Sequence, residues 1–292
     1  MIEKDSLQRF LFDTTQIRGE IIRLNAAYKA IKDRHPYPLF VQQFLGQALA
    51  ASALLSATIK FTGRLTLQIQ SDGPISLLVV QSDNEFHLRG LAKWNNEKKI
   101  ENDFSNAFGE GQLAITIAPL EGERYQGIVA LNGNNLANSI ETYFHQSEQL
   151  PTCLCLFADE EAAGGIFLQA MPADTIEGRY QLWEHLLHLT RTLTTNELFK
   201  LPNQVILKRL FHEEDVLLFD AEPVAFRCDC SIEKMESALL IFGEQEVNDI
   251  LNINKLVTVT CEFCHHHYDF DKVDVARIFA HGATIKNSSE AN

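Results

Sequence analysis

Apolar and polar residues alternate over several short stretches in the first 170 residues, which is the period of a half-buried β-strand. The clearest case is Leu65–Gln70, with the sequence LTLQIQ. A Ser71-Asp72-Gly73-Pro74 turn separates it from a second apolar run at 75–80, so the pattern predicts a β-hairpin. Further strands are predicted at 86–94, 112–118, 125–131, 152–157 and 165–170.

Helical patterns lie among these strands. Residues 39–59 form a long alanine- and leucine-rich stretch with few charges, which predicts a helix buried on most sides. Gln47, Ser52 and Ser56 interrupt its apolar run, which falls short of the roughly twenty apolar residues that span a bilayer. Residues 5–33 look helical near their start and end, and 134–146 reads as a helix entered through an asparagine cap. Antiparallel strands with a few helices among them predict an α+β domain over residues 1–174.

The pattern changes in residues 175–226. Apolar residues such as Trp183, Leu186 and Leu193 recur at helical spacing, and further short helices are predicted from Thr195 and from Pro202. A short strand is predicted at 216–219. We interpret this segment as an amphipathic helical linker whose apolar faces must rest on another part of the protein. A segment that is stable only while docked is a candidate switch.

Residues 227–292 are predicted to form a small C-terminal domain. Short helices are expected at about 231–241 and 244–252, a strand at 257–260 and a last helix at about 271–279, followed by a disordered tail. A unit of this size has little core of its own and commonly needs a metal or disulfides.

The composition narrows the class of protein. With 46% hydrophobic and 22% charged residues in 292, the chain is globular, and its length favours more than one domain. The net charge of −14 disfavours nucleic acid and anionic membranes as partners. Because no secretion signal is visible at the N-terminus, we expect a cytoplasmic protein, in which six cysteines are more typical of metal or redox chemistry than of a disulfide framework.

Four cysteines in the C-terminal domain carry the candidate chemistry. They form a Cys228-x-Cys230 pair and a Cys261-x-x-Cys264 pair, with no cysteine in between. Two such pairs can supply the four thiolates of a tetrahedral Zn²⁺ site, one per chain. The same thiols can also form disulfides with each other, so the site fits either a permanent structural zinc or a redox sensor.

Catalysis is not expected at this site. A zinc with four cysteine ligands keeps no open position for a hydrolytic water. A thiol–disulfide oxidoreductase acting through Cys261 and Cys264 would be expected within a βαβ pattern that lowers a thiol pKa, and that pattern is missing. We therefore expect a protein that is not an enzyme.

Two neighbouring motifs admit simpler interpretations. His265, His266 and His267 follow the second pair and could lend a nitrogen ligand, but four cysteines suffice and solvated histidines are favoured. Cys153 and Cys155 would face one side of a strand without a second pair, so we interpret them as packing positions.

With these residues in view, the chain resembles the heat shock protein 33 family of redox-regulated bacterial holdases. The resemblance covers nearly the full length, and its most specific part is the set of four cysteines. Other segments that look like the family are Arg18-Gly19-Glu20, Ser71–Pro74, Glu121–Gly127, Glu148–Thr152, Ala162–Gly165 and Phe211–Glu214.

The resemblance implies a reduced, zinc-bound, inactive monomer. Oxidative stress together with heat would form the disulfides Cys228–Cys230 and Cys261–Cys264, release the zinc and unfold first the C-terminal domain and then the linker. The oxidised form would act as a homodimer that holds unfolding client proteins without ATP. The alternative hypothesis is a constitutive zinc-stabilised protein-binding module without a redox switch.

Overall fold

The computed structural model describes residues 4–12, 16–59, 62–98, 103–131, 133–172 and 179–289. The chain divides into two compact units, Met1–Arg227 and Cys228–Asn292, and we describe each by itself. The predicted linker belongs to the first of these units, and its status as a separate domain stays a prediction. The boundary predicted near residue 174 lies outside the described residues.

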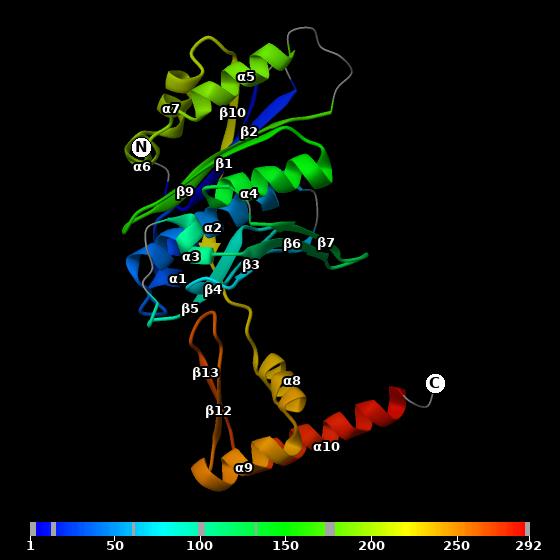
Figure 1. Cartoon of the computed structure of the whole chain (residues 1–292). Coiled ribbons are helices and arrows are strands. Elements are labelled where there is room, and N and C mark those ends of the chain that lie inside the picture. Colours follow the sequence, from blue (N-terminus) through cyan, green and yellow to red (C-terminus); the bar gives the residue numbers. More distant parts are fainter. Residues whose placement is uncertain are drawn as a thin grey trace. The chain divides into compact units, whose positions relative to one another are not determined.

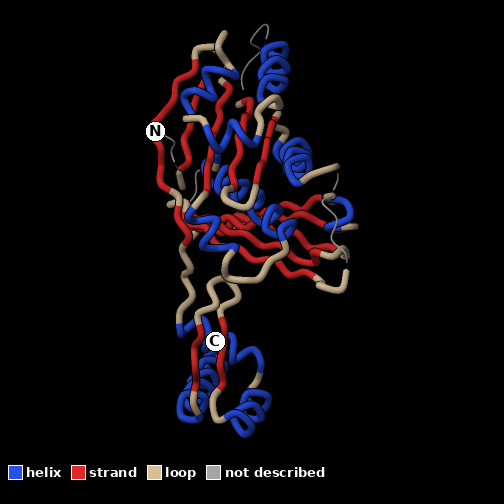
Figure 2. Tube along the Cα trace, turned by 90° about the vertical axis from the view of Figure 1, so that its left-hand side faces the viewer, coloured by secondary structure: helices blue, strands red, loops and turns tan. Residues whose placement is uncertain are grey.

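Two sheets form the first unit, and the predicted α+β class is confirmed (Figure 1). One sheet has five strands in the order β10-β1-β2-β9-β8, and the other has six in the order β11-β5-β4-β3-β6-β7. Strands of one sheet run across the direction of the other (Figure 2). Their bounds are β1 Ser6–Phe12, β2 Ile17–Leu24, β3 Gly63–Ser71, β4 Ile75–Asp83, β5 His87–Trp94, β6 Gly111–Pro119, β7 Tyr125–Ala130, β8 Thr152–Ala158, β9 Ala163–Ala170, β10 Val216–Pro223 and β11 Ala225–Phe226.

Helix α2 (Leu39–Thr58) lies between the two sheets and is buried over most of its length. Its apolar residues pack against residues of both sheets, such as Leu67 of the six-stranded sheet and Phe167 of the five-stranded sheet. By length and composition α2 is also the one helix in the described residues that could span a membrane, but 72% of the tested window is buried inside the fold, as in a core helix. Shorter helices flank this layer: α1 Ala26–Lys32, α3 Phe104–Phe108, α4 Leu136–Tyr143 and a π-helical turn η1 at Phe144–Glu148.

The start of the chain forms a strand where the residue pattern predicts a helix. Residues predicted as the first helix form β1, which pairs with β2 as a hairpin and with β10 on its other side. Leu7 faces the core around α2, whereas Phe10 and Phe12 face the opposite side of the sheet. Because β1 is buried on both faces, its sequence lacks the alternation of a half-buried strand, and the apolar spacing imitates a helix.

The other predicted elements of the first unit appear within a few residues of their predicted bounds. Asn135 caps α4 as expected, its side chain accepting a hydrogen bond from the Asn138 amide at 2.9 Å. Glu20 on β2 is only 1% exposed, and its Oε2 has no hydrogen-bond partner in the described structure. Burial raises the pKa of Glu20 to about 7, although Arg18 and Arg9 act to lower it.

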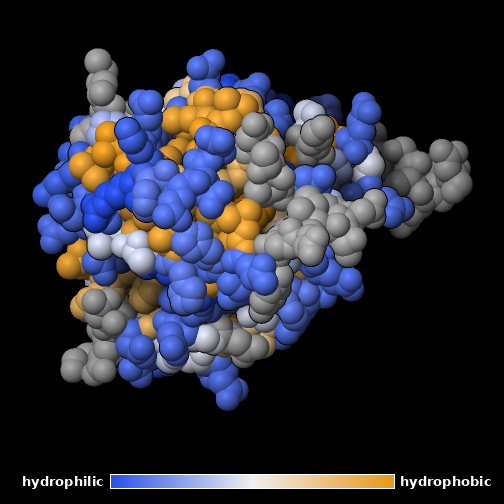
Figure 3. Space-filling view, turned by 90° about the horizontal axis from the view of Figure 1, so that it is seen from above, coloured by the Kyte–Doolittle hydropathy of each residue, from blue (hydrophilic) through white to orange (hydrophobic). Residues whose placement is uncertain are grey.

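The predicted linker forms three helices on the outer face of the five-stranded sheet (Figure 1): α5 Arg179–Thr190, α6 Thr195–Lys200 and α7 Asn203–Leu210. Their apolar residues complete a second core with Phe10, Ile21 and Leu168 of the sheet. The strand after them, β10, joins this sheet at its edge rather than standing apart. Seen from this side, the surface shows apolar areas divided by polar side chains (Figure 3).

The second unit is smaller. It contains α8 Ile232–Phe242, α9 Glu244–Asn254, the antiparallel strands β12 Val257–Thr260 and β13 His267–Phe270, and α10 Lys272–Ser289. Among the residues whose side chains are described, its core holds few buried apolar residues, which are Leu239, Val247, Leu251, Val257, Phe270, Val275 and Ile278. A core of this size provides little stability by itself.

Candidate metal centre

The second unit brings the four cysteines together from two short segments. Cys228 and Cys230 lie in the chain just before α8, whose first turn is capped by the Ser231 hydroxyl. Cys261 and Cys264 lie in the turn between β12 and β13. Elements that are local in sequence therefore position both pairs, as the spacing predicts.

Backbone hydrogen bonds shape the turn that carries the second pair. The His265 amide donates to the Cys261 carbonyl at 2.8 Å, and the Cys261 amide donates to the His266 carbonyl at 2.9 Å. His265 has the left-handed φ of +58° that this tight turn requires. The turn exposes the three histidine side chains and directs both thiols to the interior of the site.

The four sulfur atoms lie within 4.8 Å of one another and could hold a metal ion. The Cys228–Cys261 sulfurs are 3.7 Å apart, and the Cys230–Cys264 sulfurs are 3.4 Å apart. A tetrahedral zinc with Zn–S bonds of about 2.3 Å holds its sulfurs about 3.8 Å apart. The size and the chemistry of the cluster thus fit zinc.

The pKa values of the thiols differ within the cluster. Burial acts to raise the pKa of Cys228, but hydrogen bonds from the Cys230 amide and from the neighbouring thiols outweigh it, and the pKa is lowered. The pKa values of Cys261 and Cys264 are raised, first of all by burial. One thiolate can therefore be stabilised by the other thiols, whereas four negative sulfurs this close together require a bound cation.

Tyr268 is a partner of the cluster that the sequence did not reveal. Its hydroxyl donates to Cys230 Sγ at 3.2 Å, and its ring contacts the His266 ring edge-on at 4.6 Å between centroids. The Nδ1 atom of His267 forms a hydrogen bond of 2.8 Å with the Thr260 hydroxyl. In the described residues, the group within metal-binding distance consists of the four cysteines and includes none of the three histidines.

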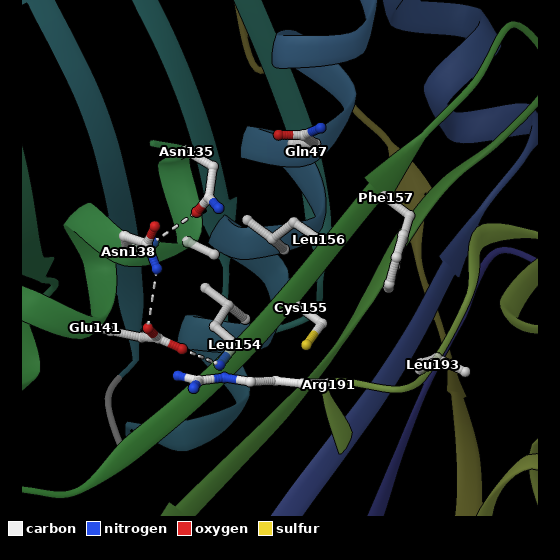
Figure 4. A pocket seen from close by; sticks show the side chains of 11 residues that line it. Gln47, Asn135, Asn138, Glu141, Leu154, Cys155, Leu156, Phe157, Arg191 and Leu193 are labelled. Atoms are coloured by element: carbon white, nitrogen blue, oxygen red, sulfur yellow. Dashed lines mark hydrogen bonds between the residues drawn. The ribbon is translucent and has the colours of Figure 1, made fainter. Parts of the chain in front are cut away.

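Cys153 and Cys155 lie in the first unit, on β8, and do not belong to the cluster. Figure 4 shows Cys155 on this strand. Both pack into the apolar layer beneath the linker helices, and the Cys155 thiol donates to the Thr190 carbonyl at 3.8 Å. Cys155 also lines a cavity of about 320 Å³ together with Arg191 and Glu141. These contacts agree with their interpretation as packing positions.

A buried arginine fastens the linker helices to the sheet. Arg23 of β2 is 2% exposed, and its guanidinium donates to the carbonyls of Leu198 and Leu201 at the end of α6. Beside it, the Asn203 amide donates to Gln8 of β1 at 2.8 Å in a buried hydrogen bond. No residue pattern indicates the contact of Arg23 with α6, because its partners are backbone atoms about 175 residues away.

The chain is similar to known proteins over nearly its whole length. The family model described as Hsp33 protein matches residues 5–271. The chain is 47% identical to a 33 kDa chaperonin of Nitrosococcus oceani, over 96% of each sequence, and 44% identical to a 33 kDa chaperonin of a Shewanella species, over 98% of this chain and 99% of the relative. A crystal structure of the 33 kDa chaperonin of Thermotoga maritima, with 23% sequence identity, has the same fold, with a TM-score of 0.81 over 96% of this chain and 99% of that one.

Proposed function

This chain belongs to the Hsp33 family of chaperones, and we propose that it is a redox-regulated holdase that binds unfolding proteins without ATP and prevents their aggregation. The observation that carries the proposal is the cluster of four thiols within 4.8 Å, in a unit whose own core is small. A metal-dependent unit of this kind can act as a sensor of thiol oxidation.

In the reduced state, Cys228, Cys230, Cys261 and Cys264 would hold one Zn²⁺ as thiolates. The zinc would supply charge neutralisation and a crosslink between the segment before α8 and the β12–β13 turn. The hydroxyl of Tyr268 would remain a hydrogen-bond donor to the sulfur of Cys230.

Oxidation would remove the ligands. Each disulfide would form when one molecule of hydrogen peroxide accepts two electrons from a pair of thiolates and two protons from solvent, and becomes two molecules of water. We assign the pairs Cys228–Cys230 and Cys261–Cys264, which the family resemblance implies. Sulfur distances of 3.7 and 3.4 Å join Cys228 to Cys261 and Cys230 to Cys264, across the two assigned pairs, so the pairing is a prediction for mass spectrometry to test.

Loss of the second unit would reach the linker through the chain itself. Cys228 follows directly on Arg227, whose amide donates to the Leu88 carbonyl at 3.0 Å and holds β11 against β5. Unfolding that begins at Cys228 would next release β11 and β10. The three linker helices would then lose a neighbour on one side and uncover the apolar face of the sheet.

The proposed partners and location follow from the same picture. Clients would be unfolding proteins of the cytoplasm, and the oxidised form would be a homodimer. The charge of −14 would keep the opened protein soluble and would disfavour nucleic acid and anionic membranes. We do not assign an enzymatic activity.

Treatment with peroxide at elevated temperature tests the proposal. We expect about one zinc released per chain, together with suppression of light scattering from a heat-unfolded reporter protein. If the oxidised protein retains its zinc and the reporter aggregates as before, the redox switch is wrong. Suppression by the reduced, zinc-loaded protein would favour the constitutive binding module.

A further inference from the structure

The two sheets of the first unit end in four edge strands, and three of these are protected against pairing with another chain. β10 carries Asp220, Glu222 and Pro223, and β11 is two residues long. At β8 the Leu154 amide donates to Glu141 at 2.8 Å, so a side chain of α4 occupies the edge (Figure 4). Charges, proline, short length and a covering group are the usual means of protecting an edge.

The fourth edge, β7, has none of these features in the part of the chain that the structure describes. Its sequence, YQGIVA, contains neither a charged residue nor a proline. β7 is the last strand of the six-stranded sheet and pairs on one side with β6. An uncharged edge strand without such protection is a template for another extended chain.

The register shows which groups are available. The Leu131 amide donates to the Gly111 carbonyl at 2.9 Å, which places residues 125, 127 and 129 in hydrogen-bonded pairs with β6. The backbone groups of Gln126, Ile128 and Ala130 therefore point away from the sheet. Their side chains lie on the exposed face, and that of Ile128 is 55% exposed.

The other face of β7 adjoins a large cavity. Gly127 allows close approach to Tyr143, whose ring would lie 2.3 Å from an added Cβ. Tyr125 is 43% exposed and lines a cavity of about 730 Å³ whose apolar wall includes Ile117 and Phe144. An edge strand beside an apolar pocket is the arrangement by which proteins bind extended peptides through added β-pairing.

We propose that β7 binds an extended, uncharged segment of an unfolding client, which adds to the sheet as a seventh strand and places an apolar side chain in the cavity beside Tyr125. The identity of the occupant rests on the chaperone function proposed above, because folded proteins rarely present a free extended segment. β7 contains no linker residue, so this edge can bind a short peptide in reduced and oxidised protein alike, whereas prevention of aggregation is assigned above to the apolar face that oxidation uncovers.

A labelled peptide of alternating valine and threonine with one tryptophan is the probe, tested on the full chain in both redox states. Ile128→Pro removes an amide that points outward and is not used in the β6 pairing. Ile128→Thr is the matched control, because it removes apolar surface but keeps the amide. We expect Ile128→Pro to weaken peptide binding by about tenfold or more and Ile128→Thr to leave most of it.

Two further measurements keep the test independent of the fold of one variant. Ile128→Lys places a charge on the edge and is expected to weaken binding as proline does. In the wild type, the peptide should slow hydrogen exchange at the amides of Gln126, Ile128 and Ala130. A peptide that is N-methylated on alternate amides should bind weakly and should not slow this exchange.

Peptide binding that is unchanged in Ile128→Pro and Ile128→Lys, or amides of β7 that stay unprotected, would overturn the inference. A dimer, detected by sedimentation, that protects the β7 amides from exchange and excludes the peptide would also overturn it. Because the peptide assay does not depend on oxidation or zinc, its failure is distinguishable from failure of the proposed switch.

Discussion

Replacement of Arg23 by methionine would test whether the linker helices are held down by a buried charge. The Arg23 guanidinium donates to two carbonyls at the end of α6, Leu198 and Leu201, and the side chain is 2% exposed. Hydrogen bonds from a charged group contribute about 1.5–3 kcal/mol each. Methionine keeps the apolar stem but leaves both carbonyls without this donor.

We therefore expect Arg23→Met to destabilise docking of α6 and α7 by about 3 kcal/mol, which corresponds to roughly a hundredfold increase in the open population. Native-state hydrogen exchange at the amides of Ile206 and Leu207 measures this opening, since both side chains are buried against the sheet. Amides of α2 should be much less affected, because α2 belongs to the other core.

Arg209→Met provides a matched control on the same helices. Arg209 forms an ion pair with Glu197 of α6, but its side chain is 62% exposed. Glu197 is 13% exposed, but solvent around Arg209 screens the pair, which we expect to contribute about 1 kcal/mol or less, so this variant should change the exchange rates only slightly. Equal effects of the two substitutions would refute the assignment of a special role to the buried arginine.

The functional consequence can be measured in the reduced protein. If the linker covers client-binding surface, reduced Arg23→Met should suppress aggregation of a reporter protein while it keeps its zinc, whereas reduced Arg209→Met should not. A reduced Arg23→Met protein with an open linker and no suppression would show that the covered face does not bind clients.

Three other predictions concern the metal centre and a buried carboxyl group. Cys228→Ser removes a proposed zinc ligand and should weaken zinc binding by more than about 100-fold, the loss typical when a residue that only hydrogen-bonds to a ligand is replaced. Cys155→Ser should leave zinc binding unchanged, and competition with a chelating dye measures both variants. Removal of the metal with a chelator should abolish hydrogen-exchange protection in α8 and α9 but not in α2, and retained protection in α8 would contradict metal-dependent folding. The pKa of Glu20 is raised to about 7 in the folded protein, so as the pH rises the unfolded state releases the Glu20 proton before the folded state does. The free energy of unfolding of the wild type should therefore fall between about pH 4.5 and 7, by up to about 3 kcal/mol. Urea unfolding at pH 5 and pH 7.5 should show this loss in the wild type and a smaller one in Glu20→Gln, and equal pH dependence in both would refute it.

Elements with one buried face, or with mainly local contacts, can be predicted from the residues alone. The alternation at Leu65–Gln70 reports one buried face, and the structure has β3 there, from Gly63 to Ser71. The apolar run at 39–59 became α2, which ends at Thr58. The cysteine spacing predicted the cluster because each pair lies within one turn of chain, and such turns are set by nearby residues.

Features that depend on distant partners emerge only in the packed fold. β1 carries the apolar spacing of a helix because the core around α2 covers one of its faces and the linker helices cover the other, which erases the alternation of a half-buried strand. The contact of Arg23 with α6 could not be foreseen, since carbonyl acceptors have no sequence signature. The exposed edge of β7 likewise exists only because the order of strands places it last. Local patterns fix an element, whereas the covering of its faces and edges is fixed by packing.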